Sequence, residues 1–519
     1  MPPRNVERPY WGDLHSHCSI SYGHGTVEQA LLRAREQLDF CSVTGHAFWP
    51  DMPDDRSRYA EIIDYHTTGF ARCRRNWPRL LEQLNTASRS GEFVAFPSYE
   101  WHSLKYGDHN VYSQEPVLEL HDEPDLPALR RWCEHAGAIA IPHHIGYAAG
   151  YRGIDWDHYR EEVSPFVEIF SLHGCSLSDD APCPMLHDMG PRDAGSTAEA
   201  GWERGRRFGI VGGSDHHGAY PGSHGDGRMG VFADALTRQS LWDAMRARRV
   251  FAVTGDKIDA RHFVNDAWIG SEIVAPGERR HRIVVRGSDA LDRVELVKNG
   301  RIVQRFFPLW HGSPSRELTT RSVVPLSDSE TSRRFRLRIT WGWGRKTELV
   351  RWTAGLSLSE GTITEIETCF SGQPIVAPQE QRGDKEIPDD EDLPHQLTER
   401  SDNSCAWRSV TTGNPTMRHA TTQAISLEID ADPGAVISVE MNGQAFTHSL
   451  AELLHAGRSH YLRGWLSEAV RIGPAVPLSD CEIDAEWTDR ADGDTDRYRL
   501  QVAQVNGQWA WLSPIWARR

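Results

Sequence analysis

The chain has 519 residues, too many for a single hydrophobic core, so we expect at least two domains. Its formal net charge is −16 and no basic stripe is present, which argues against bulk nucleic acid as a partner. The polar opening MPPRNVERPYWGD, the lack of any run of about 18 apolar residues and the nine scattered cysteines without a CxxC pair predict a cytoplasmic protein with reduced thiols and no membrane contact.

Helical segments alternate with short apolar strands through the first half. TVEQALLRAREQL at 26–38 has apolar residues at helical spacing and a capping-box pair in Thr26 and Gln29, and it precedes the apolar run FCSVT. The same order recurs where LPALRRWCEHAG precedes AIAIP and where TAEAGWERGRR precedes FGIVGG. This alternation predicts a parallel sheet with helical crossovers, in which functional residues gather at the carboxyl ends of the strands.

Histidines and carboxylates follow these strands. Of the 25 histidines, 17 lie before residue 257, and the motifs HSH, TGH, YEWH, GDHN, PHH and SDHH each come after an apolar run. This pattern predicts a metal centre, since imidazole and carboxylate groups are the usual ligands at such strand ends. The candidates exceed the roughly four to six ligands of one ion, so we expect two or three divalent ions of Zn, Mn or Fe that share carboxylates. The candidate ligands are His15, His17, His46, Glu100, His109, His143, His144, Asp215 and His217.

For several of these residues the sequence is compatible with more than one role. Only one of His143 and His144 is needed as a ligand, and a plain loop position is the alternative for His109, which lies farther from its strand. Other residues are candidates for orienting a ligand or facing the substrate, with a structural role as the alternative: His24, His102, Glu168, His173 and His216.

On these motifs, in this order, the chain resembles the polymerase and histidinol phosphatase (PHP) domain family over residues 8–256. The segment ALTRQSLWDAMRARRVFAVTGDKI further resembles a poorly characterised PHP subfamily with a C-terminal β domain. The resemblance implies a distorted TIM-like (β/α)7 barrel with a trinuclear site, in the α/β class. By this resemblance the first ion is held by His15, His17, Glu100 and Asp215, the second by Glu100, His109 and one of His143 and His144, and the third by His46 and His217.

Two positions depart from the family pattern. Tyr22 stands where the family often has an Asp that serves the third ion, with His24 as a candidate replacement, and Gly45 stands where the TDH-like motif has Asp. The resemblance therefore leaves open whether the third ion is bound.

A cluster of divalent ions lowers the pKa of a bound water and makes hydroxide available for hydrolysis. The resemblance favours a phosphoester as the target, with an amide, ester or lactone, or a non-catalytic scaffold, as alternatives. We expect a small anionic substrate. His216 is the candidate that protonates the leaving group, and Lys105, Arg152 and Arg228 are candidate cations for the substrate, with solvated surface charge as the alternative.

After residue 257 apolar and polar residues alternate between Asn-Gly turns, as in VELVKNGRIVQ, which predicts antiparallel strands. We therefore divide the chain into a hydrolase barrel at 1–256 and an all-β, sandwich-like domain at 257–519, through which homo-oligomers could form. The acidic, Pro-rich residues 377–404 predict a mobile loop.

Overall fold

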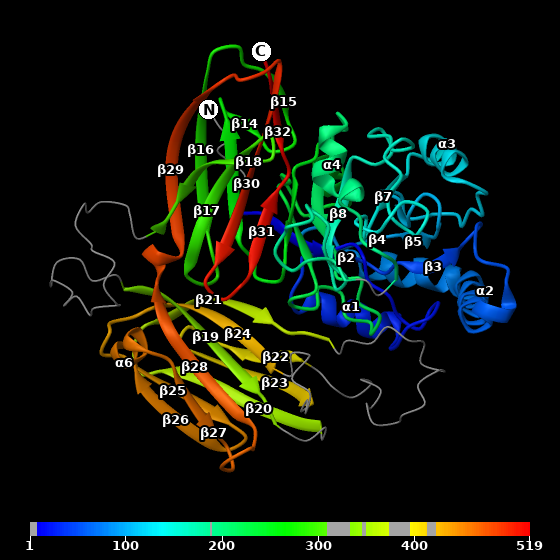
Figure 1. Cartoon of the computed structure of the whole chain (residues 1–519). Coiled ribbons are helices and arrows are strands. Elements are labelled where there is room, and N and C mark those ends of the chain that lie inside the picture. The colour runs from blue at the N-terminus through cyan, green and yellow to red at the C-terminus, as the bar shows by residue number, and fades with distance from the viewer. Residues whose placement is uncertain (1–7, 187–188, 309–332, 345–348, 373–394, 413–421) are drawn as a thin grey trace.

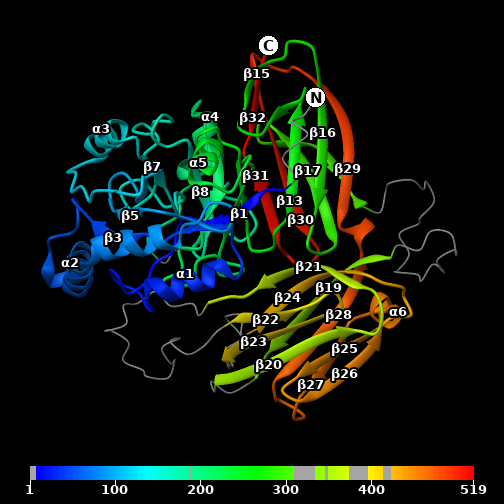
Figure 2. The ribbon, with the colours of Figure 1, turned by 180° about the vertical axis from the view of Figure 1, so that it is seen from behind.

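The computed structural model describes residues 8–186, 189–308, 333–344, 349–372, 395–412 and 422–519. Figures 1 and 2 show three parts: an α/β part that contains the N-terminal half, an upright β part that contains both the middle and the end of the chain, and a β-sandwich below them. Among the described residues, no helix combines the length and apolar character that a membrane crossing needs.

The helices of the α/β part begin at side-chain caps. In α1 (Val27–Arg35) the predicted capping box of Thr26 and Gln29 is confirmed. The long helix α2 (Arg56–Ala87) starts at Asp55, and α3 (Leu126–Ala136) starts at Asp125 and ends at Gly137, whose φ of 67° suits glycine. Two shorter helices, α4 (Ala198–Glu203) and α5 (Arg238–Arg246), complete this part.

The strands of the α/β part lie in three sheets. The parallel run is β1 (Tyr10–Asp13), β2 (Phe40–Ser42) and β4 (Val94–Phe96). A second sheet has the order β3 (Gly45–Phe48), β5 (Ser98–Trp101), β6 (His109–Tyr112) and β7 (Ile139–Pro142). The third contains β8 (Phe166–Ser171), β9 (Gly174–Cys175) and β10 (Gly209–Gly212).

The predicted distorted TIM-like (β/α)7 barrel is not found among the described residues, which form open sheets of mixed direction. Strand β3 is parallel to β5, but β6 is antiparallel to both of its neighbours, β5 and β7. The physical reason is the short link 102–108 between β5 and β6, which has no crossover helix, whereas a parallel connection needs a dozen or more residues. The α/β class itself is confirmed.

The sheet that contains β1 runs on into the end of the chain. Strands β11 (Arg228–Val231) and β12 (Val250–Val253) follow β1 antiparallel, and β12 pairs with β31 (Trp509–Leu512). The sheet then continues through the remaining strands β15 (Glu272–Val274), β17 (Leu291–Lys298), β18 (Arg301–Phe306), β30 (Thr495–Gln504) and β32 (Ile515–Arg518). The predicted hairpin at Asn299-Gly300 is confirmed. The division at residue 256 stays a prediction, and hydrogen bonds of one sheet cross it.

A four-stranded sheet packs on this part of the long sheet. It contains β13 (Asp259–Val264), β14 (Ala267–Trp268), β16 (Glu278–Arg286) and β29 (Glu482–Arg490). Their shared core includes Trp11, Phe251, Ile283 and Leu500, all buried. Strands β1, near the start of the chain, and β30, near its end, therefore share one hydrophobic core with the middle of the chain.

The predicted sandwich is confirmed for the described residues between 334 and 477, where two five-stranded sheets enclose a core that includes Trp341, Trp352 and Trp407. One sheet contains β19 (Arg334–Gly342), β21 (Thr362–Cys369), β24 (Thr422–Asp430), β27 (Arg458–Tyr461) and β28 (Ala469–Pro477). The other contains β20 (Leu349–Leu358), β22 (Gln396–Arg400), β23 (Ser404–Thr412), β25 (Val436–Met441) and β26 (Gln444–Ser449), and α6 (Leu450–His455) follows it.

The predicted loop at 377–404 is wrong for residues 396–400. They form β22, whose backbone pairs with β23 at the edge of its sheet. Residues 377–394 of that prediction lie outside the described residues.

Candidate metal centre

The first and last histidine motifs, about 200 positions apart in the chain, lie side by side. The amide of His17 donates to the carbonyl of His216 at 2.8 Å, and the amide of Asp215 donates to the carbonyl of His15 at 2.8 Å. The buried Asp13 at the end of β1 accepts hydrogen bonds from the amide and hydroxyl of Ser214. This backbone pairing brings both motifs to the same end of the sheet.

His15, His17 and Asp215 form the first group of potential ligands. Asp215 Oδ1 lies 3.2 Å from His15 Nε2 and 3.1 Å from His17 Nε2, while its Oδ2 lies 3.0 Å from Nε2 of His173. Burial alone would raise the pKa of Asp215, but the surrounding imidazoles outweigh it and hold that pKa well below its ordinary value. Asp215 has a φ of 54°, a left-handed conformation that only surrounding contacts can maintain.

Glu168 lies behind His15. Its Oε2 is 2.9 Å from His15 Nδ1, so Glu168 is placed to orient the ring with Nε2 toward the group. A Cβ on Gly213 would lie 2.3 Å from Glu168 Oε2 and 2.8 Å from the Cβ of His15. Glycine at 213 therefore makes room for this pair.

Glu100, Asp108, His143 and His144 form a second group. Glu100 Oε1 lies 3.1 Å from His143 Nε2, and Asp108 Oδ2 lies 3.4 Å from His144 Nε2. The Arg152 guanidinium donates to the same Asp108 oxygen, with Nε at 2.8 Å. Burial would raise the pKa of Asp108, but Arg152 and the nearby histidines hold it well below its ordinary value.

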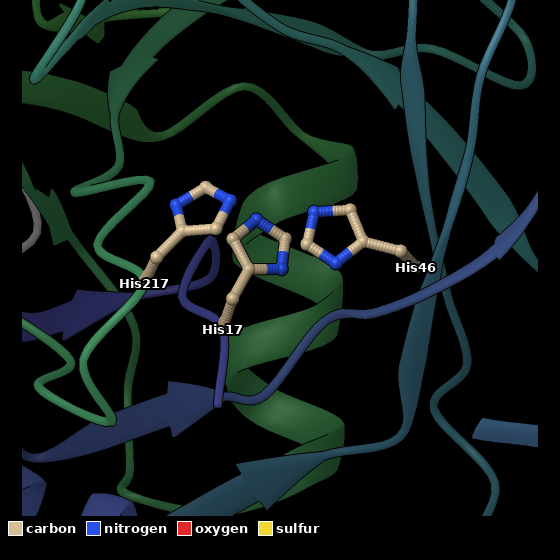
Figure 3. Close-up of side chains that lie close together, drawn as sticks. All are labelled: His17, His46 and His217. Atoms are coloured by element: carbon tan, nitrogen blue, oxygen red, sulfur yellow. The ribbon is translucent and has the colours of Figure 1, made fainter. Parts of the chain in front are cut away.

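The third group is purely imidazole and consists of His17, His46 and His217. Figure 3 shows the ring of His17 between the other two, and its centroid lies 3.9 Å from that of His46 and 4.4 Å from that of His217. Each Nδ1 atom already has a partner: Thr44 O at 2.5 Å for His17, Ser21 Oγ at 2.9 Å for His46, and Asp215 O at 2.8 Å for His217. For His17 and His217 the partner is a carbonyl, so Nδ1 carries the proton and Nε2 keeps its lone pair for a metal.

Glu100 connects the groups. Its Oε2 lies 3.3 Å from His17 Nε2, 3.5 Å from His46 Nε2 and 3.8 Å from His15 Nε2. Together with His46 and His102 it makes up a fourth, overlapping group. One carboxylate at the centre of several imidazoles is the arrangement that a shared metal ligand requires.

The donors present fit divalent metal ions. His15 Nε2, Glu100 Oε2 and His143 Nδ1 are buried and have no hydrogen-bond partner among the described residues. Burial and the neighbouring His17 lower the pKa of His46 and of His217 well below the ordinary value, so these rings are neutral, as metal ligation requires. Buried carboxylates are costly without a counter-charge, which ions of Zn, Mn or Fe would supply to this mixture of nitrogen and oxygen atoms.

All but one of the ligands predicted from the sequence lie in these groups: His15, His17, His46, Glu100, His143, His144, Asp215 and His217. His109 lies in none of them. Its Nδ1 is 2.9 Å from the carbonyl of Gly107, and its ring faces Trp101 at a centroid distance of 6.1 Å. The adjacent Asp108 joins the second group instead. Asp108 was not predicted as a ligand, although it stands in the same GDHN motif. Neighbouring side chains of an extended segment point in opposite directions, so the sequence alone does not show which of the two points toward the metal groups.

The candidate substrate cations lie in different surroundings. Arg152 contacts Asp108 beside the second group. Lys105 is exposed, with Nζ 4.7 Å above the Tyr106 ring. Arg228 does not lie in a loop, because it begins β11 and is fully buried, and its guanidinium donates to Gly222 O, Gly255 O and Gln37 Oε1 at 2.7–3.0 Å. These hydrogen bonds indicate that Arg228 has a structural role. Of the three candidate substrate cations, Arg152 is the one that lies beside the metal groups.

His216, the candidate acid, and Tyr22, which stands at the position of the family Asp, both lie near the metal groups. His216 is buried outside the metal groups, and its Nδ1 accepts a hydrogen bond from the Gly218 amide at 3.0 Å. The ring of Tyr22 stacks on His46 with centroids 3.6 Å apart, and its hydroxyl lies 3.1 Å from His66 Nε2. Tyr22 thus covers one face of a candidate ligand and supplies no carboxylate.

Comparisons with known proteins give little functional information. A family described as "Protein of unknown function (DUF3604)" matches residues 215–276, the segment that starts at Asp215. An uncharacterised protein of Chlamydia pneumoniae is 27% identical over 245 residues, which cover 43% of this chain and 36% of that protein. An uncharacterised protein of Chlamydia muridarum is 27% identical over 173 residues, or 30% of this chain and 28% of that protein. The chain thus spans about a third of the length of these relatives.

Among solved structures, a two-domain protein of Bacteroides vulgatus that contains a predicted PHP-like metal-dependent phosphoesterase is similar to this chain. The two share 16% sequence identity at a TM-score of 0.30, and the match covers 57% of this chain and 81% of the other. At this score the likeness supports no conclusion about the function of this chain.

Proposed function

We propose that the chain is a metal-dependent hydrolase that cleaves a phosphoester with two or three divalent ions of Zn, Mn or Fe. The observation that carries the proposal is the convergence of imidazoles on Glu100 and Asp215, whose carboxylate oxygens lie within 3.5 Å of Nε2 atoms from His15, His17 and His46. A buried set of this kind has no evident structural purpose without cations, because each carboxylate would be desolvated at a cost of several kcal/mol.

Divalent ions bound here would supply hydroxide near neutral pH and neutralise charge on a phosphoryl group. The protein's own part is orientation. Thr44 and Glu168 fix the rings of His17 and His15 through Nδ1, and Arg152 holds Asp108 through its guanidinium. Rings and carboxylates locked in this way need no rearrangement on binding, which favours a preorganised site.

Arg152 is the proposed contact for an anionic substrate. Its side chain is 13% exposed beside the second group and lies over the Trp49 ring, with the guanidinium carbon 5.3 Å from the centroid. Its Nε and Nη2 contact Asp108, Nη2 also lies 2.9 Å from His102 Nδ1, and Nη1 donates to Met189 Sδ at 3.1 Å, so a phosphoryl oxygen would be bound through Nη1. For the leaving-group proton we retain His216, next to Asp215 and His217, as a proposal.

The decisive experiment is turnover of chromogenic esters by the purified full chain. We expect hydrolysis of p-nitrophenyl phosphate or bis(p-nitrophenyl) phosphate, its loss after chelation, and its return on adding Mn²⁺, Zn²⁺ or Fe²⁺. Glu100→Gln should be inactive, whereas Glu428→Gln, at a buried carboxylate of the sandwich, serves as the matched control.

Other outcomes of that assay discriminate between functions. Chelator-sensitive hydrolysis of p-nitrophenyl acetate or an anilide, with phosphate esters untouched, would replace the phosphoester by a carbon-centred bond. Metal binding without turnover across the whole panel would favour a non-catalytic scaffold. We further propose a small anionic substrate and a cytoplasmic location, without nucleic acid or membrane partners. Homo-oligomers would form through the β domain predicted at 257–519.

A further inference from the structure

The end of β21 leaves the sandwich and runs along the loop that follows the SDHH motif. Phe370 O accepts a hydrogen bond from the His224 amide at 2.9 Å, and Ser371 Oγ donates to His224 O at 2.7 Å. The Gly372 amide donates to Ser223 Oγ at 3.0 Å. Three consecutive residues of the sandwich are therefore bonded to the segment that begins with Asp215.

Gly372 packs directly on the ring of His216. A Cβ at position 372 would lie 2.5 Å from both Cε1 and Nε2 of His216 and 2.8 Å from Cβ of Tyr220. Real Cβ atoms do not approach other atoms so closely, so any side chain here would displace the ring. The lack of a side chain, rather than an unusual backbone conformation, is what this position requires.

His216 is tightly connected to the metal groups through its backbone. Its carbonyl accepts a hydrogen bond from the His17 amide at 2.8 Å, and its backbone forms an isolated parallel β-bridge with Ser16. Its chain neighbours are Asp215 and His217, which belong to the first and third groups. A displacement of the buried ring would thus shift candidate ligands on both sides.

Further contacts hold the sandwich against the rest of the molecule. Arg338 of β19 donates to both carboxylate oxygens of Asp256 at 2.6 Å, and Thr368 of β21 donates to Glu36 O at 3.0 Å. Burial would raise the pKa of Asp256, but Arg338 and His224 hold it well below its ordinary value. The sandwich is therefore docked by the Arg338–Asp256 ion pair and by a hydrogen bond from Thr368 to the residue that caps the C-terminal end of α1.

We propose that Gly372 is a positioning residue for the metal centre: because it has no side chain, the docked sandwich leaves the His216 ring undisplaced, and Asp215 and His217 on either side of it keep the geometry that binds metal. The inference rests on the proposed metal centre. It adds that the affinity of this centre for metal ions depends on the sandwich, which contributes no residue to the ligand groups described above. It needs no knowledge of the substrate.

The test is a metal titration of full-length variants. Co²⁺ or Zn²⁺ is titrated against a competing chromogenic chelator, and ions bound per chain are counted by plasma mass spectrometry. Gly372→Ala should bind metal at least about tenfold more weakly. The control is Gly434→Ala in the same sandwich, where a Cβ would meet nothing within 4 Å, and its affinity should equal that of the parent.

A rescue experiment tests the route through the ring. His216→Ala alone should keep the parent affinity within about twofold, and adding it to Gly372→Ala should recover most of the lost affinity, since the two substitutions share one steric contact. Equal affinities for Gly372→Ala and its control would overturn the proposal. So would a double variant as weak as Gly372→Ala, or loss of metal in His216→Ala alone.

A second, milder variant covers the case in which Gly372→Ala does not fold. Ser371→Ala removes the hydroxyl bonded to His224 O without adding volume, and loss of one such hydrogen bond should weaken binding about fivefold. Its control is Ser359→Ala, which loses a hydroxyl bonded to the Val436 amide inside the sandwich. Identical affinities for these two variants would contradict the inference. A parent chain that binds no metal at all would instead refute the proposed function.

Discussion

The Asp108 carboxylate lies 3.4 Å from His144 Nε2, whereas the imidazole of the next residue, His109, is bonded to the Gly107 carbonyl. Of two adjacent residues with ligating side chains, the geometry thus favours the carboxylate as the ligand of the second group. We expect Asp108→Asn to lose about one bound ion per chain and His109→Gln to keep all of them, as counted by plasma mass spectrometry. Asn preserves the shape of Asp but not its charge, so the loss is electrostatic.

The opposite result would contradict this assignment of the ligand. If His109→Gln loses an ion and Asp108→Asn does not, the second group is built on the imidazole, as the sequence resemblance implied. Thermal unfolding of both variants in excess metal separates a ligand effect from a general loss of stability.

Glu100 is the residue whose loss should be felt most widely. Its Oε2 lies within 3.8 Å of Nε2 atoms from His15, His17 and His46, and its Oε1 contacts His143. Glu100→Gln should therefore lower metal content by more than one ion per chain and reduce turnover at least about a hundredfold. A variant with full metal content would show that Glu100 is not shared between ions. Glu428→Gln again provides the control.

Metal removal should destabilise the fold around the centre. Without cations, the counter-charges of the buried Glu100, Asp108 and Asp215 within the described part of the chain are imidazoles and Arg152. A ligand present at about a thousand times its Kd stabilises by about 4 kcal/mol, so chelation should lower the melting temperature by several degrees and metal return should restore it. An unchanged melting temperature after verified removal of metal would contradict binding at these buried groups.

The sequence was informative where the chemistry is local. Motifs that follow apolar strands led to eight of the ligand candidates, and the Thr26 capping box and the Asn299-Gly300 hairpin depend on neighbouring residues alone. The distorted (β/α)7 barrel is not found in the residues that the structure describes because the direction of β6 depends on the short link 102–108, and a pattern of apolar residues does not show where the chain turns back. Pairing of β12 with β31 joins residues about 260 positions apart, and no local periodicity reports such a contact.

The positions of several side chains around the metal groups could not be predicted from the sequence for similar reasons. Whether Asp108 or His109 points inward depends on the rotation of one short strand. That Gly372 touches His216 depends on how the sandwich docks, and the role of Arg228 depends on carbonyls of loops near 222 and 255. These relationships arise from packing between distant segments.

A buried histidine pair in the upright β part should make stability depend on acid pH. His262 Nε2 and His281 Nδ1 lie 3.0 Å apart on β13 and β16, and the other nitrogen of each ring has no hydrogen-bond partner among the described residues. Burial, together with Arg279 and Lys298 and despite the opposing Asp489, lowers the pKa of His281 to about 4. Burial and His281 lower the pKa of His262 well below its ordinary value.

These lowered pKa values make the protein less stable as the pH falls. A histidine whose pKa is lowered on folding binds its proton in the unfolded chain first, so its contribution to stability is full above pH 6.5 and is lost as the pH falls toward the folded value. For His281 the shift from 6.5 to about 4 corresponds to about 3 kcal/mol of unfolding free energy. His281→Phe should remove this part of the pH dependence, because Trp487 and Tyr498 already surround the ring with aromatic side chains.

The measurement is urea unfolding in saturating metal at several pH values between 4 and 7, with the exposed His455→Asn as the control. The parent and the control should lose stability steeply below pH 6.5, and His281→Phe should lose about 3 kcal/mol less over that interval. Parallel curves for His281→Phe and the parent would mean that the pair takes up its proton in the folded protein as readily as in the unfolded chain, and the acid sensitivity would then have to arise from other buried groups.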